Sequence, residues 1–371
     1  MVQAASDETA RLLGLTHDAY VASAAARAER PAAASRRYTA FHREGLVPPG
    51  AEPPAPHRTL ESDSPEGVVR KFLLRVPGGP PRAKGRALPV LGDETLETES
   101  VVIPMATRSG RLTHTLCVSS QVGCAMGCAF CETAQMGLLR SLTPAEIVAQ
   151  WWAATHTLGQ RVKNIVFMGM GEPLDNLDAV LAAIETLTDH RGPSVAMSNI
   201  TVSTVGRVRE MRRLGERVRE PGWRRLNLAV SINAPNDAIR DEIMPMNRTA
   251  PLDEVIAVME SWPLRSSSAI CAEYVLIPGV NDADEHAEEL AQRLKNVRCC
   301  VNVIPYNPRR HSPWPAPEER DVERFLRRLE AAGQFCKRRR TKGRDTMAAC
   351  GQLGNERIRR RRLVEPAAPP S

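Results

Sequence analysis

Short apolar runs alternate with amphipathic segments along most of the chain, and this alternation restricts the possible folds more than any other feature. Six runs predict β-strands, at 113–120, 164–171, 199–206, 226–234, 272–280 and 300–308. The segments between them predict helices, at 143–159, 177–190, 205–220, 252–262 and 285–296. Repeated strand–helix units predict a parallel sheet. Because a complete (β/α)8 barrel needs two more units, we expect an α/β fold with a partial (β/α)6 barrel.

The first of these helices has a clear start. Thr143 is its expected N-cap, Pro144 occupies the first helical position, and Glu146 stands three residues after the cap. This arrangement predicts a capping box, in which the cap and the glutamate each satisfy a backbone N–H group.

The regions on either side of this core have a different character. Residues 1–56 are rich in Ala, Arg and Pro, with candidate short helices at 7–30 and 36–43 and an irregular stretch at 47–56. Residues 66–76 and 97–105 predict two more strands, joined by a loop rich in Gly and Pro. We expect an N-terminal accessory region and linker at 1–64, a core at 65–355 and a basic tail at 356–371.

We expect neither a secreted protein nor a membrane protein. The first thirty residues mix alanine with charged side chains such as Asp7, Glu8 and Arg11, which predicts no signal peptide. No later run approaches the ~18 to 20 apolar residues of a membrane helix. A cytoplasmic location with reduced thiols is therefore the expectation. The formal net charge of +7 agrees with an anionic partner but does not identify one.

The nine cysteines are unevenly distributed, and the cluster among them indicates metal chemistry. Cys124, Cys128 and Cys131 form a C-x3-C-x2-C run directly after the first barrel strand. Three thiolates on one loop can hold three irons of a [4Fe–4S] cluster and leave the fourth iron open. Zinc is the alternative, but zinc prefers four ligands, and no second cysteine pair stands nearby.

The stretch CVSSQVGCAMGCAFCETAQMG at 117–137 resembles the radical S-adenosylmethionine (SAM) enzymes, and within them the RlmN/Cfr family of RNA adenine methyltransferases. The likeness continues in family order through VFMGMGEPLDN, VSTVG, SINAPNDAIRDEIMPMN, EYVLIPGVNDADEHAEEL, NVIPYNP and AACGQL. It covers roughly residues 65 to 355. The resemblance implies a radical-SAM barrel, a [4Fe–4S] cluster on Cys124, Cys128 and Cys131, and SAM as cofactor.

The resemblance also implies a SAM site at the ends of the later strands. Gly169 belongs to the same glycine-rich turn as Gly171 and Glu172, and the latter two match positions that contact the methionine end of SAM. Further SAM-contacting positions correspond to Ser203, Ser231, Ile232, Asn233 and Asn307. Asn233 stands where the family usually has His. Asparagine can donate and accept hydrogen bonds but does not titrate near neutral pH.

Two further thiols and one carboxylate acquire roles only through the resemblance. Cys350 corresponds to the cysteine that is methylated and carries the methyl group, and Cys117 to the thiol that resolves the protein–RNA adduct, leaving a disulfide. Glu99 corresponds to the proposed proton acceptor. Without the resemblance, Cys350 would be interpreted as a small buried hydrophobe and Glu99 as a solvated carboxylate near a strand start.

The implied activity is methylation of adenine carbon 2, or of carbon 8, in RNA. We expect 23S rRNA as the first substrate and tRNA as the second, with flavodoxin or ferredoxin as a class of electron donor. The basic runs 337–344 and 357–362 flank Cys350 and are able to neutralise phosphates, although such runs are commonly solvated faces. The alternatives are a radical SAM enzyme of this family with another substrate and a zinc-bearing RNA-binding protein.

Overall fold

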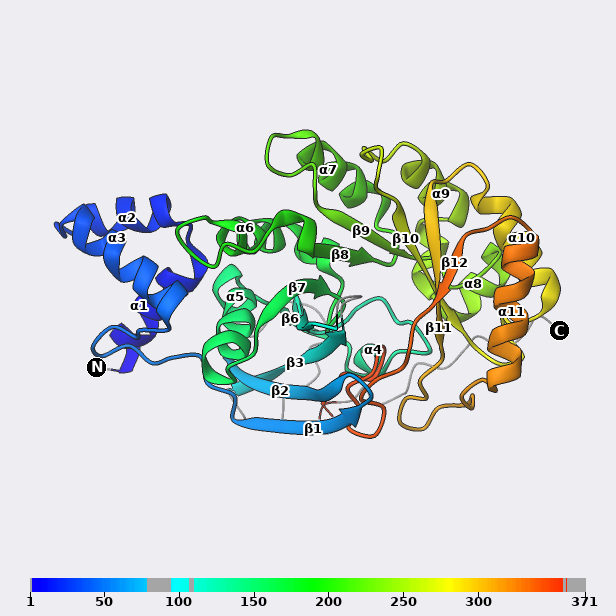
Figure 1. The fold of residues 1–371 in the computed structure, drawn as a ribbon, viewed down its shortest axis with the longest axis horizontal. Helices are drawn as coiled ribbons and strands as arrows, with labels where there is room; N and C mark the ends of the chain where they lie inside the picture. The colour runs from blue at the N-terminus through cyan, green and yellow to red at the C-terminus, as the bar shows by residue number, and fades with distance from the viewer. Residues whose placement is uncertain (1, 79–94, 107–109, 356–357, 359–371) are drawn as a thin grey trace, which may run out of the picture. The chain divides into compact units, whose positions relative to one another are not determined.

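The structure of the protein is a computed structural model, which describes residues 2–78, 95–106, 110–355 and 358 (Figure 1). The chain divides into two units, one formed by 1–122 with 140–200 and the other by 123–139 with 201–371. The chain passes between them within β5 (Gln121–Gly123), within β6 (Leu138–Ser141) and at the start of β8 (Ile200–Thr204).

The first unit contains a mixed sheet. Its strand order is β1 (Arg58–Ser64), β2 (Gly67–Pro77), β3 (Thr95–Ala106), β4 (Leu112–Cys117) and β7 (Val162–Phe167). The pairs from β1 to β4 are antiparallel, whereas β4 and β7 are parallel. The two predicted strands at 66–76 and 97–105 are thus confirmed as β2 and β3. Strand β1 was not predicted, because its sequence is polar and only one of its residues is buried.

Helices α5 (Pro144–Trp152) and α6 (Leu177–Thr188) also belong to the first unit. The predicted capping box is present: Thr143 N–H donates to Glu146 Oε2 at 2.8 Å, and Glu146 N–H donates to Thr143 Oγ1 at 3.3 Å. After Trp152, the helix continues as a π-helical turn over Ala153–Thr157.

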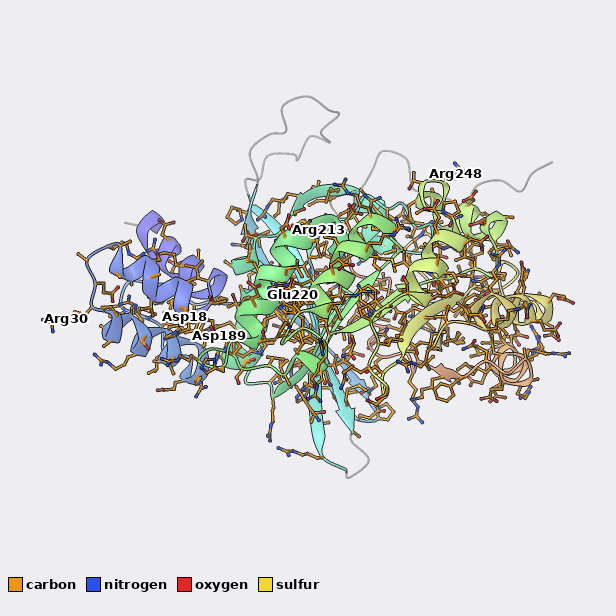
Figure 2. All side chains as sticks on the ribbon, turned by 90° about the horizontal axis from the view of Figure 1, so that it is seen from above. Asp18, Arg30, Asp189, Arg213, Glu220 and Arg248 are labelled. Atoms are coloured by element: carbon orange, nitrogen blue, oxygen red, sulfur yellow. The ribbon has the colours of Figure 1, made fainter. Side chains whose placement is uncertain are left out.

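Three helices precede the sheet, namely α1 (Val2–Gly14), α2 (His17–Ala25) and α3 (Pro31–Thr39), and α2 packs against α3. Helix α1 contacts both α5 and α6 (Figure 1). At the end of α6, the Asp189 carboxylate accepts the His17 N–H at 2.6 Å, and Figure 2 shows Asp189 beside Asp18. The helices predicted at 7–30 and 36–43 are therefore present, and 47–56 has no regular structure apart from a turn.

The second unit contains a parallel sheet in the order β8, β9 (Asn227–Ser231), β10 (Ile270–Leu276), β11 (Cys299–Pro305) and β12 (Cys336–Arg338). Its helices are α4 (Glu132–Met136), α7 (Val208–Arg219), α8 (Asp237–Ile243), α9 (Leu252–Glu260), α10 (Asp284–Leu294) and α11 (Glu319–Ala331). Figure 1 shows α10 against α11 and α7 near α9, in agreement with their contacts.

All six predicted barrel strands form, as β4 and β7 to β11, so the expected α/β architecture with a mainly parallel sheet is confirmed. Their central residues are apolar and fully buried, as at Ile165, Val202, Ala229 and Val301, each 0% exposed. This burial on the strand faces supplies the hydrophobic stabilisation of the sheet. Among the described helices, none combines the length and apolarity that crossing a membrane requires.

Candidate active site

The loop 123–139, which carries the predicted cluster cysteines, is closed by two glycines. Gly123 has φ of +75°, and a Cβ atom there would overlap the carbonyl oxygen of Gly137. Cys124 N–H donates to that same oxygen at 3.0 Å. Glycine is therefore required at Gly123 both for the left-handed backbone and for the close approach. We call this segment the cysteine loop.

The cysteine loop is held by buried contacts within the second unit. Ala129 N–H donates to Ile243 O at 2.9 Å, and Nε of the buried Arg309 donates to Ala129 O at 2.7 Å. The buried Glu132 carboxylate accepts the Arg310 N–H at 3.1 Å and pairs with its guanidinium at 3.3 Å. These contacts fix the loop backbone, so the positions of its thiols depend on the neighbouring loops.

The donor chemistry of the cysteine loop suits an iron–sulfur cluster. Cys124, Cys128 and Cys131 are all free thiols, as are the other six cysteines. Burial raises the pKa of the Cys131 thiol, and the N–H groups of Thr133 and Ala134 oppose that shift by hydrogen bonding to its sulfur. Three thiols on one loop fit a cluster that uses three protein ligands. Within the described ranges, no three His, Cys, Asp or Glu side chains converge as a metal-binding group.

The loop that carries Cys350 is bonded directly to the cysteine loop. Glu132 N–H donates to Gly351 O at 2.7 Å, and Thr133 Oγ1 donates to Leu353 O at 2.6 Å. The Cys350 carbonyl accepts Nδ2 of the buried Asn307 at 3.3 Å. Three predicted site elements, far apart in sequence, therefore meet in one unit.

Cys350 lies between opposing charges. Its enclosure by protein raises the pKa of the thiol, and the Arg339 guanidinium opposes this shift, since a cation stabilises the thiolate. Arg339 pairs with the buried Glu273 at 3.2 Å, and Glu273 also accepts the Ser203 hydroxyl at 3.0 Å. The predicted residue Ser203 thus belongs to a buried polar network that extends toward Cys350.

The basic run 337–344 begins in β12 and pairs with neighbouring elements, although Lys337, Arg338, Arg340 and Arg344 are exposed, as expected for a solvated face. Besides the pair of Arg339 with Glu273, Arg338 pairs with Glu319, and Arg344 donates to Asn307 Oδ1 at 3.1 Å. Arg338, Arg340 and Arg344 line a cavity of about 550 Å³. The second basic run, 357–362, lies outside the described residues except for Ile358.

A fully buried arginine fastens the ends of β8 and β9, and the sequence interpretation did not identify it. Arg240 donates to Ile232 O at 3.0 Å, Ser231 O at 3.0 Å, Val205 O at 2.6 Å and Asn247 Oδ1 at 2.5 Å. Burial lowers its pKa to about 10, so it remains cationic at neutral pH. Ser231 and Ile232, both predicted SAM-contacting positions, are therefore oriented through their carbonyl groups.

Asn233 has a structural role that accounts for its side chain. Its φ is +58°, in the left-handed region where asparagine is enriched. Its Oδ1 accepts the Val275 N–H at 2.9 Å, and its carbonyl accepts Nδ2 of Asn281 at 2.7 Å. The Nδ2 group lies 3.3 Å from the Met244 sulfur. Asn233 thus joins the end of β9 to β10, and a contact with SAM stays a prediction.

In the first unit, the glycine-rich turn after β7 packs on the segment that follows β4. Gly171 has φ of +99°, and a Cβ atom there would stand 2.5 Å from Cβ of Gln121, so a larger residue is excluded. Gly169 N–H donates to Val118 O at 3.0 Å. The buried Glu172 donates its N–H to Gln121 Oε1 at 2.9 Å and accepts the Leu174 N–H at 3.0 Å.

Cys117 and Glu99 are buried in the sheet of the same unit. Cys117 ends β4 and is in register with Val101 of β3 and Val166 of β7. Glu99 lies within β3, 4% exposed, and pairs with the equally buried Lys71 of β2 at 2.8 Å. The interpretation of Glu99 as a solvated carboxylate is therefore wrong, because the β2–β3 register brings a lysine to it.

Comparison with known proteins identifies the family. The Radical SAM superfamily model matches residues 118–293. The dual-specificity RNA methyltransferase RlmN of Syntrophotalea carbinolica is 43% identical over 78% of this chain and 71% of its own. The protein of the same name from Alkalilimnicola ehrlichii is 40% identical over 81% of this chain and 78% of its own. This chain belongs to the RlmN-type radical SAM RNA methyltransferases.

A solved structure of a radical SAM methyltransferase agrees with this assignment at the level of the fold. The radical SAM methyltransferase from Sphaerobacter thermophilus matches with a TM-score of 0.78 and 35% identity, over 92% of this chain and 98% of that one. As an RlmN-type enzyme, this chain uses a [4Fe–4S] cluster and SAM and methylates RNA. The expected family, enzyme class and cofactors are confirmed.

Sequence interpretation of this RlmN-type chain missed the buried charges Lys71, Arg240, Glu273 and Arg309. Two of them carried a recognisable signal. Glu273 is the one charged residue of the strand ICAEYVL, and Lys71 directly precedes the apolar run FLL in a strand that also contains Arg70 and Arg75. A charge at such a position needs a partner when the strand is buried, and here the partners are Glu99 and Arg339.

Proposed function

We propose that this RNA methyltransferase methylates carbon 2 of adenine, in 23S rRNA first and tRNA second, through a methyl group carried on Cys350. The observation that carries the proposal is the attachment of the Cys350 loop to the cysteine loop through Glu132 and Thr133. A thiol outside the C-x3-C-x2-C run, held next to it, has the location that a methyl carrier needs.

Within this proposal, Cys124, Cys128 and Cys131 hold the cluster. The binding residues for SAM are Gly171, Glu172, Ser203, Ser231, Ile232, Asn233 and Asn307. When bound, the cluster and SAM supply the radical that activates the methyl group, which is chemistry that side chains do not provide. The protein positions the reacting atoms: Asn307 holds the Cys350 carbonyl, and Arg240 holds the strand ends at Ser231 and Ile232.

Cys350 acts first as a nucleophile: its thiolate, favoured by the nearby Arg339 guanidinium, would displace the methyl group from one SAM molecule, which leaves as a neutral thioether. The methyl group on Cys350 would lose one hydrogen atom to the SAM-derived radical, and its carbon would then bond to adenine, with the remaining unpaired electron passing back to the cluster. Glu99 accepts the ring proton, and Lys71 stabilises its carboxylate beforehand. Cys117 attacks the sulfur of Cys350 as a thiolate, which breaks the carbon–sulfur bond and leaves a Cys117–Cys350 disulfide. The released carbon keeps the electron pair and takes up a proton, which completes the methyl group of the RNA. A thiol reductant returns both residues to the free thiols seen here.

The RNA specificity draws on the relatives and on charge. Their name, dual-specificity RNA methyltransferase, supports activity on more than one RNA. Arg338, Arg340 and Arg344 place cationic charge around a cavity in the unit that holds Cys350. We further propose a cytoplasmic location, with flavodoxin or ferredoxin as electron donor.

The test is an anaerobic assay of three single-cysteine variants with 23S rRNA and tRNA transcripts. Cys350→Ala should lose methyl transfer, yet retain iron and SAM cleavage. Cys117→Ala should accumulate a covalent RNA adduct, seen as a retarded band on a denaturing gel. Cys300→Ala is the matched control, because this partly exposed cysteine on β11 lies outside the proposed mechanism. Methyl transfer by Cys350→Ala at the control rate would contradict the carrier role.

The substrate and the carbon require a separate measurement. RNA from a strain that lacks the gene should lose 2-methyladenosine from 23S rRNA and tRNA, measured by mass spectrometry of nucleoside digests. Loss of 8-methyladenosine instead would refute the choice of carbon. Loss from a different RNA would favour the alternative of a family member with another substrate.

A further inference from the structure

A cavity of about 950 Å³ in the first unit has no role in the reaction proposed above. It lies where β4 and β7 begin, whereas Cys117 is the last residue of β4 and the glycine-rich turn follows β7. Thr113, which lines the cavity, precedes Cys117 by four residues of β4, so the two are about 13 Å apart along the strand at ~3.3 Å per residue.

The cavity is strongly basic. Arg43, Arg111, Arg161 and Lys163 line it, and none of the described lining residues is acidic. Arg161 and Lys163 are exposed, and neither side chain takes part in a hydrogen bond or ion pair anywhere in the described parts of the chain. A concave surface with several cations and no carboxylate attracts an anion more strongly than isolated surface charges do.

Aromatic rings form another part of the wall. Trp151 lies 6.3 Å from His42 and 5.7 Å from His156, measured between ring centroids, and all three line the cavity. Burial lowers the pKa of His42 to about 4, so this ring is neutral at pH 7. The positive charge of the cavity therefore comes from the arginines and the lysine, and the rings supply an apolar surface.

The inner wall also contains polar atoms that the protein leaves unsatisfied. Nε2 of His42 donates to Leu12 O at 2.8 Å, so Nδ1 of this neutral ring carries a lone pair. That Nδ1 atom and Oγ1 of Thr155 are buried without a hydrogen-bond partner. Buried polar atoms are normally paired, so two orphans in one cavity wall indicate a polar group brought by a ligand or by water.

We propose that this cavity binds a phosphate group of the RNA substrate, as an anchor remote from the methylated nucleotide. Arg161 and Lys163 contact the phosphate oxygens. Trp151 is 5% exposed, so its ring supports the wall behind these cations and is not a stacking face for a base. A concave surface with several cations can hold the RNA backbone without reading its sequence, because every nucleotide carries a phosphate. The proposal rests on RNA as substrate and not on the carbon that is methylated. A free nucleotide would offer the same phosphate chemistry.

The test compares two doubly neutralised variants of the complete enzyme. Arg161→Gln/Lys163→Gln removes the two exposed cations of the cavity. Arg30→Gln/Arg75→Gln is the control, because these exposed arginines belong to the same unit, do not line the cavity and produce an equal charge change. Figure 2 shows Arg30 at the tip of the N-terminal helices. Binding of 23S rRNA and tRNA transcripts is measured at several salt concentrations, alongside calorimetry with inorganic phosphate and adenosine monophosphate.

The cavity variant should bind RNA at least tenfold more weakly than the control near 0.1 M salt. Its plot of log affinity against log salt should be shallower by about 2, one for each cation that no longer neutralises a phosphate. Iron content and SAM cleavage should equal those of the control, which separates this outcome from a failure of the proposed reaction. Equal RNA affinities for the two variants would overturn the proposal. Loss of nucleotide or phosphate binding with unchanged RNA affinity would also overturn it, in favour of a small-anion site.

Discussion

Asn233 offers a sharp test of the structure, because one residue combines a left-handed backbone with a buried hydrogen bond. Its φ of +58° costs an alanine roughly 1–2 kcal/mol, whereas glycine adopts it freely. Loss of Oδ1 leaves the Val275 N–H without its partner, at about 1–3 kcal/mol. We therefore expect the free energy of unfolding to fall by about 2–5 kcal/mol in Asn233→Ala and by about 1–3 kcal/mol in Asn233→Gly.

The histidine variant completes the series. Histidine is also enriched in the left-handed region, and its ring can offer an acceptor nitrogen. The expected stability order is therefore Asn, then His, then Gly, with Ala the least stable. Thermal unfolding of the apoprotein measures this order, and hydrogen exchange of a peptide containing Val275 reports the individual bond.

Two results would refute this reasoning. If Asn233→Gly were no more stable than Asn233→Ala, the left-handed backbone conformation would contribute nothing to the difference in stability. Unchanged exchange at Val275 in both variants would show that the Oδ1 contact is not a stabilising hydrogen bond. The N–H of Gln334, which donates to Leu329 O at 2.9 Å at the end of α11, is an internal control in the same unit that should not change.

The other predictions concern buried charges and one titrating ring. Arg240→Met should lower the thermal midpoint sharply, since four acceptors lose their donor at about 1–3 kcal/mol each, and Arg240→Lys should recover part of the loss. Lys71→Met should cost about 3–5 kcal/mol in denaturant unfolding because it leaves Glu99 buried without its cation, and adding Glu99→Gln should restore most of that stability. The pKa of His42 is lowered from 6.5 to about 4 in the folded protein. As the pH falls, His42 therefore binds a proton in the unfolded state at a higher pH than in the folded state. The contribution of neutral His42 to the free energy of unfolding should be fully present above pH 6.5, and up to ~3 kcal/mol of it should be lost as the pH falls to 4. The free energy of unfolding of His42→Gln should decline less steeply over this range.

The local features of this chain were predictable from neighbouring residues. The strand–helix alternation, the capping box at Thr143 and the C-x3-C-x2-C run each depend on residues within one or two turns of one another. Their physical causes are side-chain periodicity, backbone satisfaction and ligand spacing, which a sequence shows directly. The polar strand β1 and the charged strand β12 lack this periodicity. They form because each pairs along its backbone with a neighbouring strand, β2 and β11 respectively.

Tertiary structure alone determined which charges are buried and what they contact. Strand register brings Glu99 to Lys71, and Arg240 donates hydrogen bonds to carbonyl groups at the ends of two strands. The Cys350 loop is hydrogen-bonded to the cysteine loop, which lies more than two hundred residues away in sequence. Each of these contacts joins segments that the sequence separates. A buried charge is stable only where such a partner arrives, so the whole fold, and not the local pattern, sets the chemistry around these side chains.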